Sequence, residues 1–204
     1  MPLRGRTNLK DESFFFVTTT VVDFQKIFND KKCCDALISN IKYYQKKYNF
    51  EILAYVIMPS HFHCIVQVDK KNGTISDIMR DIKKYSAWDI MEIIKDMKRE
   101  DLIKIFENNA IEYNDRKRKF WMKRFDDQVI RTQKMFYTKL NYIHNNPVKA
   151  GLVNCPEEYR YSSACNYING DHSIIKVNTQ MLGVLALVTE WSVTTEKTMF
   201  FVGN

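Results

Sequence analysis

The sequence lacks any apolar run long enough to cross a membrane, and its cysteines form no recognisable pattern. The most apolar stretch, MLGVLALV near the C-terminus, is too short to span a bilayer. The N-terminal MPLRGRTNLK lacks the apolar core of a signal peptide. The five cysteines are odd in number and include no C-x-x-C spacing, which argues against a disulfide framework. We therefore expect a cytoplasmic protein with reduced thiols and no association with a membrane.

No internal repeat or low-complexity tract interrupts the chain, so a repeat architecture is not expected. With 204 residues, of which 45% are hydrophobic, the chain is long and apolar enough for one substantial folded domain. The formal net charge of +7 suggests an anionic partner, with nucleic acid as the first candidate. Basicity alone is a weak argument, because many proteins share it.

Histidine is also scarce, yet two of the four histidines lie two residues apart in MPSHFHCIV, residues 58–66. Successive side chains of a strand point to opposite faces, so His61 and His63 share one face, which we expect to be exposed. Phe62 and Cys64 share the other, buried face. Two neighbouring imidazoles can hold one divalent metal ion, but two unrelated histidines fit this spacing equally well. A third ligand is needed to decide between these alternatives.

The hydrophobic pattern predicts alternating strands and helices. Strands are expected at 14–24, 50–58, 61–69 and 117–125, and helices at 30–48, 74–100 and 131–145, with Pro147 ending the last helix. One or two further helical turns are expected after residue 100. The order strand, helix, hairpin, helix, strand is that of a split β-α-β unit. It predicts an α+β fold, a ferredoxin-like or RRM-like sandwich, with an antiparallel sheet of four to five strands and helices on one face.

A tyrosine and an amide lie one helical turn apart in NYIHNNPVKAGLV, residues 141–153. Tyr142 lies off the apolar stripe of its helix, with Asn146 at i+4 and Lys139 at i−3. A half-buried tyrosine packed on the sheet would explain Tyr142 without any chemistry. A phenol is a poor nucleophile at neutral pH, but it can attack a phosphate that a metal ion has polarised. Two imidazoles and an amide oxygen could bind such an ion without cancelling its charge.

A basic segment with aromatic residues precedes this helix. Between residues 114 and 124, NDRKRKFWMKR, six residues are basic and one is acidic. Basic groups can follow a phosphate backbone, and aromatic rings can stack on unpaired bases. A solvated charge run around a core tryptophan is the alternative. The residues that we expect to bind DNA are Arg116, Lys117, Arg118, Lys119, Trp121, Lys123, Arg124 and Lys139.

These motifs together resemble the single-tyrosine HUH transposases, and most closely their REP-associated branch. The similar blocks are YVIMPSHFHCIVQV, FWMKRFDDQVIR, YIHNNPVKAGLV and PEEYRYSSA, in that order over residues 12–165. The resemblance implies that His61, His63 and Asn146 bind Mg²⁺ or Mn²⁺ and that Tyr142 is the nucleophile. Many relatives have a histidine where this chain has Gln128. We expect a catalytic domain over 1–165 and an extension of uncertain role over 166–204.

The resemblance implies a metal-dependent endonuclease and strand transferase that acts on single-stranded hairpin or repeat DNA through a 5′-phosphotyrosine. Two alternatives remain at this stage. One is a replication or relaxase-type HUH nickase, which commonly carries a third histidine or paired tyrosines. The other is a single-stranded nucleic-acid-binding module without catalytic activity. The enzyme could act as a monomer or as a homodimer.

Overall fold

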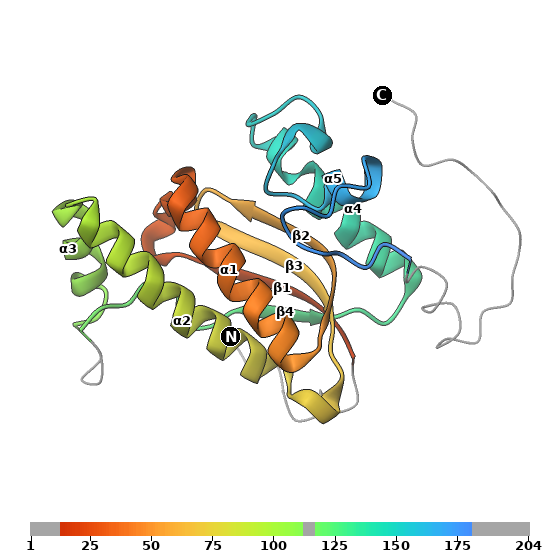
Figure 1. Cartoon of the computed structure of the whole chain (residues 1–204), viewed down its shortest axis with the longest axis horizontal. Helices are drawn as coiled ribbons and strands as arrows, with labels where there is room; N and C mark the ends of the chain where they lie inside the picture. The colour runs from red at the N-terminus through yellow and green to blue at the C-terminus, as the bar shows by residue number, and fades with distance from the viewer. Residues whose placement is uncertain (1–12, 112–116, 181–204) are drawn as a thin grey trace, which may run out of the picture.

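The computed structural model describes residues 13–111 and 117–180. Its centre is a four-stranded antiparallel sheet with the strand order β2-β3-β1-β4 (Figure 1). The strands are β1 (Phe14–Thr20), β2 (Glu51–Met58), β3 (His61–Gln67) and β4 (Asp126–Val129). β2 and β3 form the expected hairpin, joined through Pro59 and Ser60. The expected α+β class with an antiparallel sheet is therefore confirmed.

Within the described residues, five α-helices accompany this sheet. They are α1 (Lys31–Tyr48), α2 (Ile75–Asp96), α3 (Glu100–Asn108), α4 (Gln133–Lys149) and α5 (Ala164–Ile168), with short 3-10 turns at Val22–Phe24, Ile27–Asn29, Lys70–Asn72 and Pro156–Glu158. Local side chains fix where the long helices begin. The Asp30 carboxylate accepts hydrogen bonds from the first backbone amides of α1. Thr74 and Asp77 form a reciprocal capping box at the start of α2.

The helices α1 and α2 lie side by side across one face of the sheet (Figure 1). Alternation along β1 sends Phe15 and Val17 into this layer, where they meet Leu37 of α1 and Ile82 of α2. This is the larger of two buried apolar clusters. The layer is the sandwich that the sequence pattern predicts.

The helix α4 packs against the opposite face, where Phe136, Leu140 and Ile143 meet Phe16 and Val56. The expectation of helices on one face therefore holds for α1 and α2 but not for α4. The reason is visible in the strands, since β2 is buried over seven consecutive residues rather than on alternate ones. A strand that is buried on both faces needs a cover on each.

The expected strand at 117–125 is wrong, because the fourth strand lies directly after it. Within 117–125, Trp121 forms an isolated bridge with Val21, and the Met122 amide donates to the Thr20 carbonyl at 2.8 Å. Continuous pairing with β1 begins only at Asp126. The apolar pattern there comes from Phe120 and Trp121, which are buried but belong to an irregular segment.

The expected end of the last helix is also wrong, because Pro147 lies inside α4. Proline removes one amide donor, so the Ile143 carbonyl loses its partner, but the helix is already near its end. The following amides keep helical geometry, since Ala150 donates to the Asn146 carbonyl at 3.0 Å. As a result, Asn146 stands within a regular helix, one turn after Tyr142.

The segment after α4 runs along the outer edge of β2. The Tyr159 hydroxyl donates to the Ile57 carbonyl at 2.9 Å, and the Tyr167 hydroxyl donates to the Leu53 carbonyl at 2.8 Å. Further along, the Asn178 amide donates to the Ile52 carbonyl at 2.9 Å. The described part of the C-terminal extension is therefore packed against the sheet.

Across residues 13–111 and 117–180, we find no helix with the length and apolarity needed to cross a membrane.

Candidate active site

The two histidines of β3 stand side by side on the α4 face of the sheet. Their ring centroids are 4.8 Å apart and the planes are nearly perpendicular. The shared face follows from strand alternation, as the sequence predicts. The expected exposure of this face is wrong for His63, which is only 3% exposed. Phe16 stacks on its ring at 5.6 Å, and α4 covers this part of the sheet.

Tyr142 extends from α4 toward the histidine pair. Its hydroxyl oxygen lies 3.4 Å from Nε2 of His63, and the two rings meet edge to face at 5.1 Å. The tyrosine is 41% exposed, so a ligand in solution can reach its hydroxyl. Residues 79 positions apart in the chain therefore meet where the sequence analysis places a nucleophile beside a metal ligand.

Each imidazole is oriented by a neighbouring hydroxyl. Nδ1 of His63 lies 2.7 Å from the Thr18 hydroxyl oxygen, and Nδ1 of His61 lies 3.1 Å from that of Ser60. These contacts leave Nε2 of each ring as the atom that can bind a metal. Sequence reasoning missed Thr18. Only the pairing of Thr18 with His63 across β1 and β3 brings it there, and no local pattern encodes that register.

Burial keeps both imidazoles uncharged at neutral pH. Burial, with smaller contributions from the neighbouring His61 and Lys139, lowers the pKa of His63 to about 3. Burial also lowers the pKa of His61. The neutral imidazole is the form that coordinates a metal ion.

The donors present fit a divalent ion held by imidazole and neutral oxygen. Among the described residues, no three His, Cys, Asp or Glu side chains gather in one place, so a third ligand must be of another type. Asn146 stands one turn beyond Tyr142 on α4. In the described part of the chain, its amide makes no hydrogen bond to His61 or His63, whereas the Tyr142 hydroxyl lies 3.4 Å from Nε2 of His63.

A cation stands beside the tyrosine. Nζ of Lys139 lies 4.4 Å from the centre of the Phe16 ring and 5.9 Å from that of Tyr142. This is the expected position of Lys139 one turn before the tyrosine. Gln128 pairs with Phe16 across β1 and β4, so it shares the sheet face of the site.

The expected DNA-binding segment is only partly open to a ligand. Lys117, Lys123 and Arg124 are exposed, whereas Arg118 pairs with Glu107 at 2.9 Å and Lys119 is half-buried. Trp121 is 5% exposed and packs between Phe28 and Phe120, so a base cannot stack on it. The expected stacking role of Trp121 is therefore wrong, and the core alternative describes it. Arg116 lies outside the described residues.

Comparison with known proteins shows that this chain is similar to transposases. Residues 16–107 match the family model described as "Transposase IS200 like". A Haemophilus influenzae protein named as a REP-associated tyrosine transposase is 25% identical over 76% of this chain and 74% of its own length. The chain is thus similar to REP-associated tyrosine transposases. The resemblance inferred from the sequence is thus confirmed, and the protein is transposase-like.

Two further proteins are similar to this chain. The REP-associated tyrosine transposase of Escherichia coli is 28% identical over 56% of this chain and 54% of its own length. A solved structure of a REP-associated tyrosine transposase bound to a REP hairpin matches with a TM-score of 0.60 at 21% identity, covering 98% of this chain and 100% of the other. At that identity the structural match shows a shared fold.

Proposed function

We propose that this REP-associated transposase homologue is a metal-dependent endonuclease and strand transferase for single-stranded DNA. The observation that carries the proposal is the 3.4 Å approach of the Tyr142 hydroxyl to Nε2 of His63. The tyrosine oxygen attacks the scissile phosphorus, and the bond from phosphorus to the 3′ oxygen breaks. The phenol loses its proton and the leaving oxygen gains one. The products are a 5′-phosphotyrosine and a free 3′-hydroxyl, and the reverse step rejoins strands.

A divalent ion, Mg²⁺ or Mn²⁺, would be held by Nε2 of His61 and His63 and by the amide oxygen of Asn146. When bound, it supplies positive charge to the phosphate. Oxygen ligands suit Mg²⁺, and the two imidazoles make Mn²⁺ at least as suitable. Thr18 holds the His63 ring in the required orientation. Lys139 adds a positive charge beside the tyrosine, where it favours an approaching phosphate.

The substrate that we propose is hairpin or repeat DNA. The support is the family of the homologues and the REP hairpin bound by the solved relative. We assign the catalytic unit to residues 1–165 and place the activity in the cytoplasm. Residues 166–204 are an extension, whose described part packs along β2. A monomer and a homodimer are both compatible with this mechanism.

The decisive experiment compares Tyr142→Phe with wild type on an end-labelled hairpin oligonucleotide, using denaturing gels. Wild type should produce a nick and a retarded covalent adduct at the 5′ end of the cut strand. Tyr142→Phe should produce neither, because it lacks the phenol oxygen that attacks phosphorus. Since only this oxygen is removed, the fold and DNA binding should be kept. Tyr137→Phe is the matched control, since Tyr137 is an exposed phenol on the same helix.

Equal nicking by wild type and Tyr142→Phe, without an adduct, would contradict the tyrosine mechanism and favour a hydrolase. Binding without nicking by either protein would favour the alternative of a nucleic-acid-binding module without activity.

A further inference from the structure

We propose that the groove between α2 and residues 117–125 binds an unpaired stretch of the DNA strand, with Trp88 stacking on a base and the surrounding lysines contacting phosphates. The inference rests on the proposed function and deepens it, because it places a second DNA contact on the sheet face opposite Tyr142. Neither Trp88 nor Lys84 carries any signal in the sequence that points to this role.

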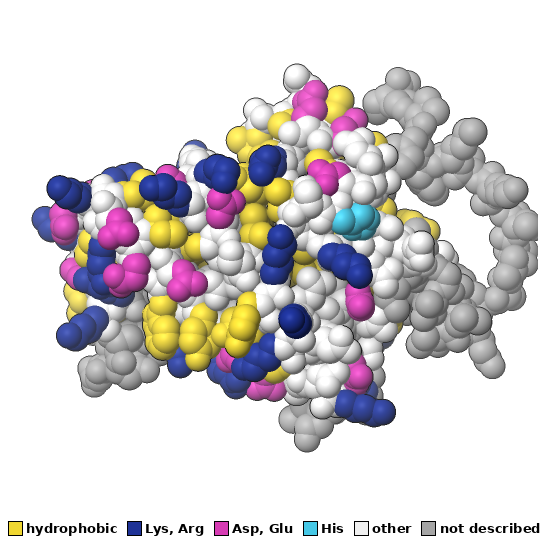
Figure 2. Space-filling view, in the orientation of Figure 1, with side chains coloured by type: hydrophobic (Ala, Val, Ile, Leu, Met, Phe, Trp, Pro, Cys, Tyr) yellow, Lys and Arg dark blue, Asp and Glu magenta, His cyan; other side chains and the backbone are white. Residues whose placement is uncertain are grey.

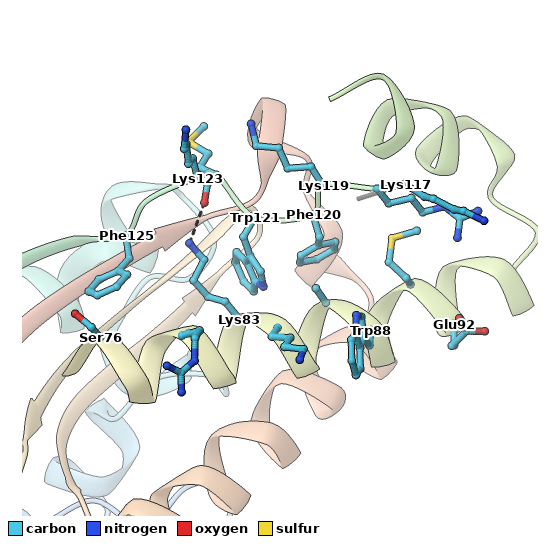
Figure 3. Close-up of a pocket in the computed structure, with 16 residues that line it drawn as sticks. Ser76, Lys83, Trp88, Glu92, Lys117, Lys119, Phe120, Trp121, Lys123 and Phe125 are labelled. Carbon is cyan, nitrogen blue, oxygen red and sulfur yellow. Dashed lines mark hydrogen bonds between the residues drawn. The ribbon is translucent and has the colours of Figure 1, made fainter. Parts of the chain in front are cut away.

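The groove is the open space between one face of α2 and the irregular segment before β4, and it has a volume of about 1210 Å³ (Figure 3). One wall is α2, which contributes Arg80, Lys83, Lys84 and Trp88. The other wall is the continuous stretch 117–123 together with Phe125. A groove of this form can hold an extended chain.

Specific contacts hold the two walls together. Nζ of Lys83 reaches across from α2 and donates to the Met122 carbonyl at 2.8 Å, the dashed line in Figure 3. The Trp121 indole donates to the Ser86 hydroxyl at 3.3 Å, and Ser86 is buried. Because these contacts tie residues 121–122 to a long helix, the groove has a defined shape before any ligand binds.

The charge of the groove selects an anionic partner. Seven lysines and arginines line it, against a single acid, Glu92. Some of these charges are already paired, since Arg80 contacts Asp77 and Asp81 and Arg118 contacts Glu107. Glu92 itself pairs with Lys95. Because seven cationic side chains line the groove against one acid, its lining has an excess of positive charge, which complements a phosphate backbone.

Trp88 supplies an open aromatic ring at this position. It is 56% exposed, whereas Trp121 in the opposite wall is 5% exposed. Nζ of Lys84 lies 4.8 Å from the Trp88 ring, and Tyr85 meets that ring edge to face at 5.1 Å. Figure 2 shows hydrophobic side chains gathered over α2, with lysine and arginine side chains around them. An exposed ring with a lysine beside it is the arrangement on which unpaired bases stack.

The groove is connected to the candidate active site through the sheet. The Met122 amide donates to the Thr20 carbonyl, and Thr20 pairs with His61 across β1 and β3. Two strand spacings, about 10 Å, therefore separate the wall of the groove from the strand that carries His61. A DNA strand held in the groove would therefore lie near β3, the strand that carries His61, on the opposite face from Tyr142.

The test measures binding of a short fluorescein-labelled oligo(dT) to the full chain by fluorescence anisotropy. Trp88→Ala should weaken binding by about 5- to 150-fold, the loss expected for one stacked base. Trp88→Phe keeps an aromatic ring and should retain most of the affinity. Oligo(dT) should quench wild-type tryptophan fluorescence, and most of this quenching should vanish in Trp88→Phe. A duplex of the same sequence should bind more weakly than the single strand, because its bases are not open to stacking.

Matched controls separate the groove from general surface effects. Tyr43→Ala removes a ring that is 64% exposed on α1 but does not line the groove, so binding should not change. Lys84→Gln should reduce the salt dependence of binding by about 0.7 log unit of slope, as expected for one lost phosphate contact. Lys42→Gln makes the same charge change on α1, outside the groove, and should have a smaller effect.

Unchanged oligo(dT) binding by both Trp88→Ala and Lys84→Gln would overturn the inference, as would tighter binding of the duplex. If Trp88→Ala fails to fold, the Trp88→Phe quenching and the Lys84→Gln slope decide the outcome. The proposed function fails separately, when wild type forms no covalent adduct although the groove variants alter binding. If wild type forms the adduct but the groove variants bind DNA as wild type does, the tyrosine mechanism stands and only the proposed role of the groove is contradicted.

Discussion

The two faces of the sheet carry opposite kinds of polar surface. On the α4 face, two histidines lie against aromatic rings, and burial keeps them uncharged. On the α2 face, the groove is open, rich in lysine and arginine, and carries an exposed tryptophan. One face can hold a reacting phosphate in a fixed geometry, while the other can hold a long, flexible polyanion.

This difference indicates that the cleavage reaction and the affinity for DNA depend on separate faces of the sheet. A group that acts at phosphorus must be fixed within a fraction of an ångström, which packing provides. Groups that bind a flexible strand contribute through charge and stacking, which tolerate movement. Substitutions on the α4 face should therefore change the rate of cleavage, and substitutions in the groove should change the dissociation constant.

The largest effect should come from His61→Ala. Loss of one imidazole removes a ligand of the proposed metal, so cleavage should fall by roughly 10³-fold or more, while oligo(dT) binding stays near the wild-type value. A gel assay of adduct formation across a Mn²⁺ titration, beside anisotropy, measures both quantities. His172→Ala removes an exposed histidine and serves as the control. Cleavage that persists within about 10-fold of wild type would show that His61 holds no essential ion.

A smaller loss is expected from Thr18→Val, which keeps the shape of the side chain but removes the hydroxyl near Nδ1 of His63. The imidazole is then free to turn, so cleavage and apparent metal affinity should fall by about 10- to 100-fold. Thr18→Ser restores the hydroxyl and should recover most of the loss. If Thr18→Ser is as impaired as Thr18→Val, packing of the methyl group, and not the hydrogen bond, explains the effect.

A still smaller effect should follow Lys117→Gln combined with Lys123→Gln in the groove. Single-strand binding should weaken, and its salt dependence should fall by up to about 0.7 log unit of slope per lost phosphate contact. Cleavage at saturating DNA should not change, because neither residue lies near Tyr142. Lys42→Gln with Lys46→Gln removes the same charge from α1 for comparison. An unchanged slope would mean that Lys117 and Lys123 contact no phosphate of the bound strand.

The smallest effect should come from His144→Gln, which changes how the stability of the fold depends on pH. Burial lowers the pKa of His144 to about 4, and its Nε2 lies 2.9 Å from the Ser163 hydroxyl oxygen. The unfolded chain takes up this proton near pH 6.5 and the folded chain only near pH 4, so stability is lost as pH falls through this interval. Between about pH 6.5 and about pH 4, the midpoint temperature of thermal unfolding should fall by a few degrees more for wild type than for His144→Gln. Parallel curves for the two proteins would show that His144 is protonated equally in both states.

Much of the fold can be predicted from the chain because its strands and long helices carry clear periodicity. Thr74 marks the start of α2, and the alternation in β3 places His61 and His63 on one face. Among the differences from the prediction, two have clear physical reasons. Pro147 fits into the last turn of α4, where a missing amide costs little, and the apolar pair Phe120 and Trp121 is buried without being in a strand.

The sequence predicts the site residues whose chemistry is distinctive. It does not predict the residues that reach the site only through tertiary contacts. The tyrosine and the histidines could be named from spacing and family resemblance. Thr18 could not, because only the register of β1 against β3 places it at His63. Two of the three tryptophans show the same limit: Trp88 and Trp121 both lie near lysines in the sequence, and only packing decides that Trp121 is core and Trp88 is surface.

The cover along β2 bears on how copies of this chain can assemble. β2 is an edge strand of the sheet, and an edge strand with open amides and carbonyls invites pairing with another molecule. Here the Tyr55 amide donates to the Ser163 hydroxyl at 3.0 Å, its carbonyl accepts from the Ser163 amide at 2.9 Å, and the Ile57 amide donates to the Tyr161 carbonyl at 2.9 Å. The chain has thus occupied this edge with its own residues. Continuation of the sheet from one subunit into the next is blocked at β2, and a pair of subunits must meet through side chains or through the β4 edge.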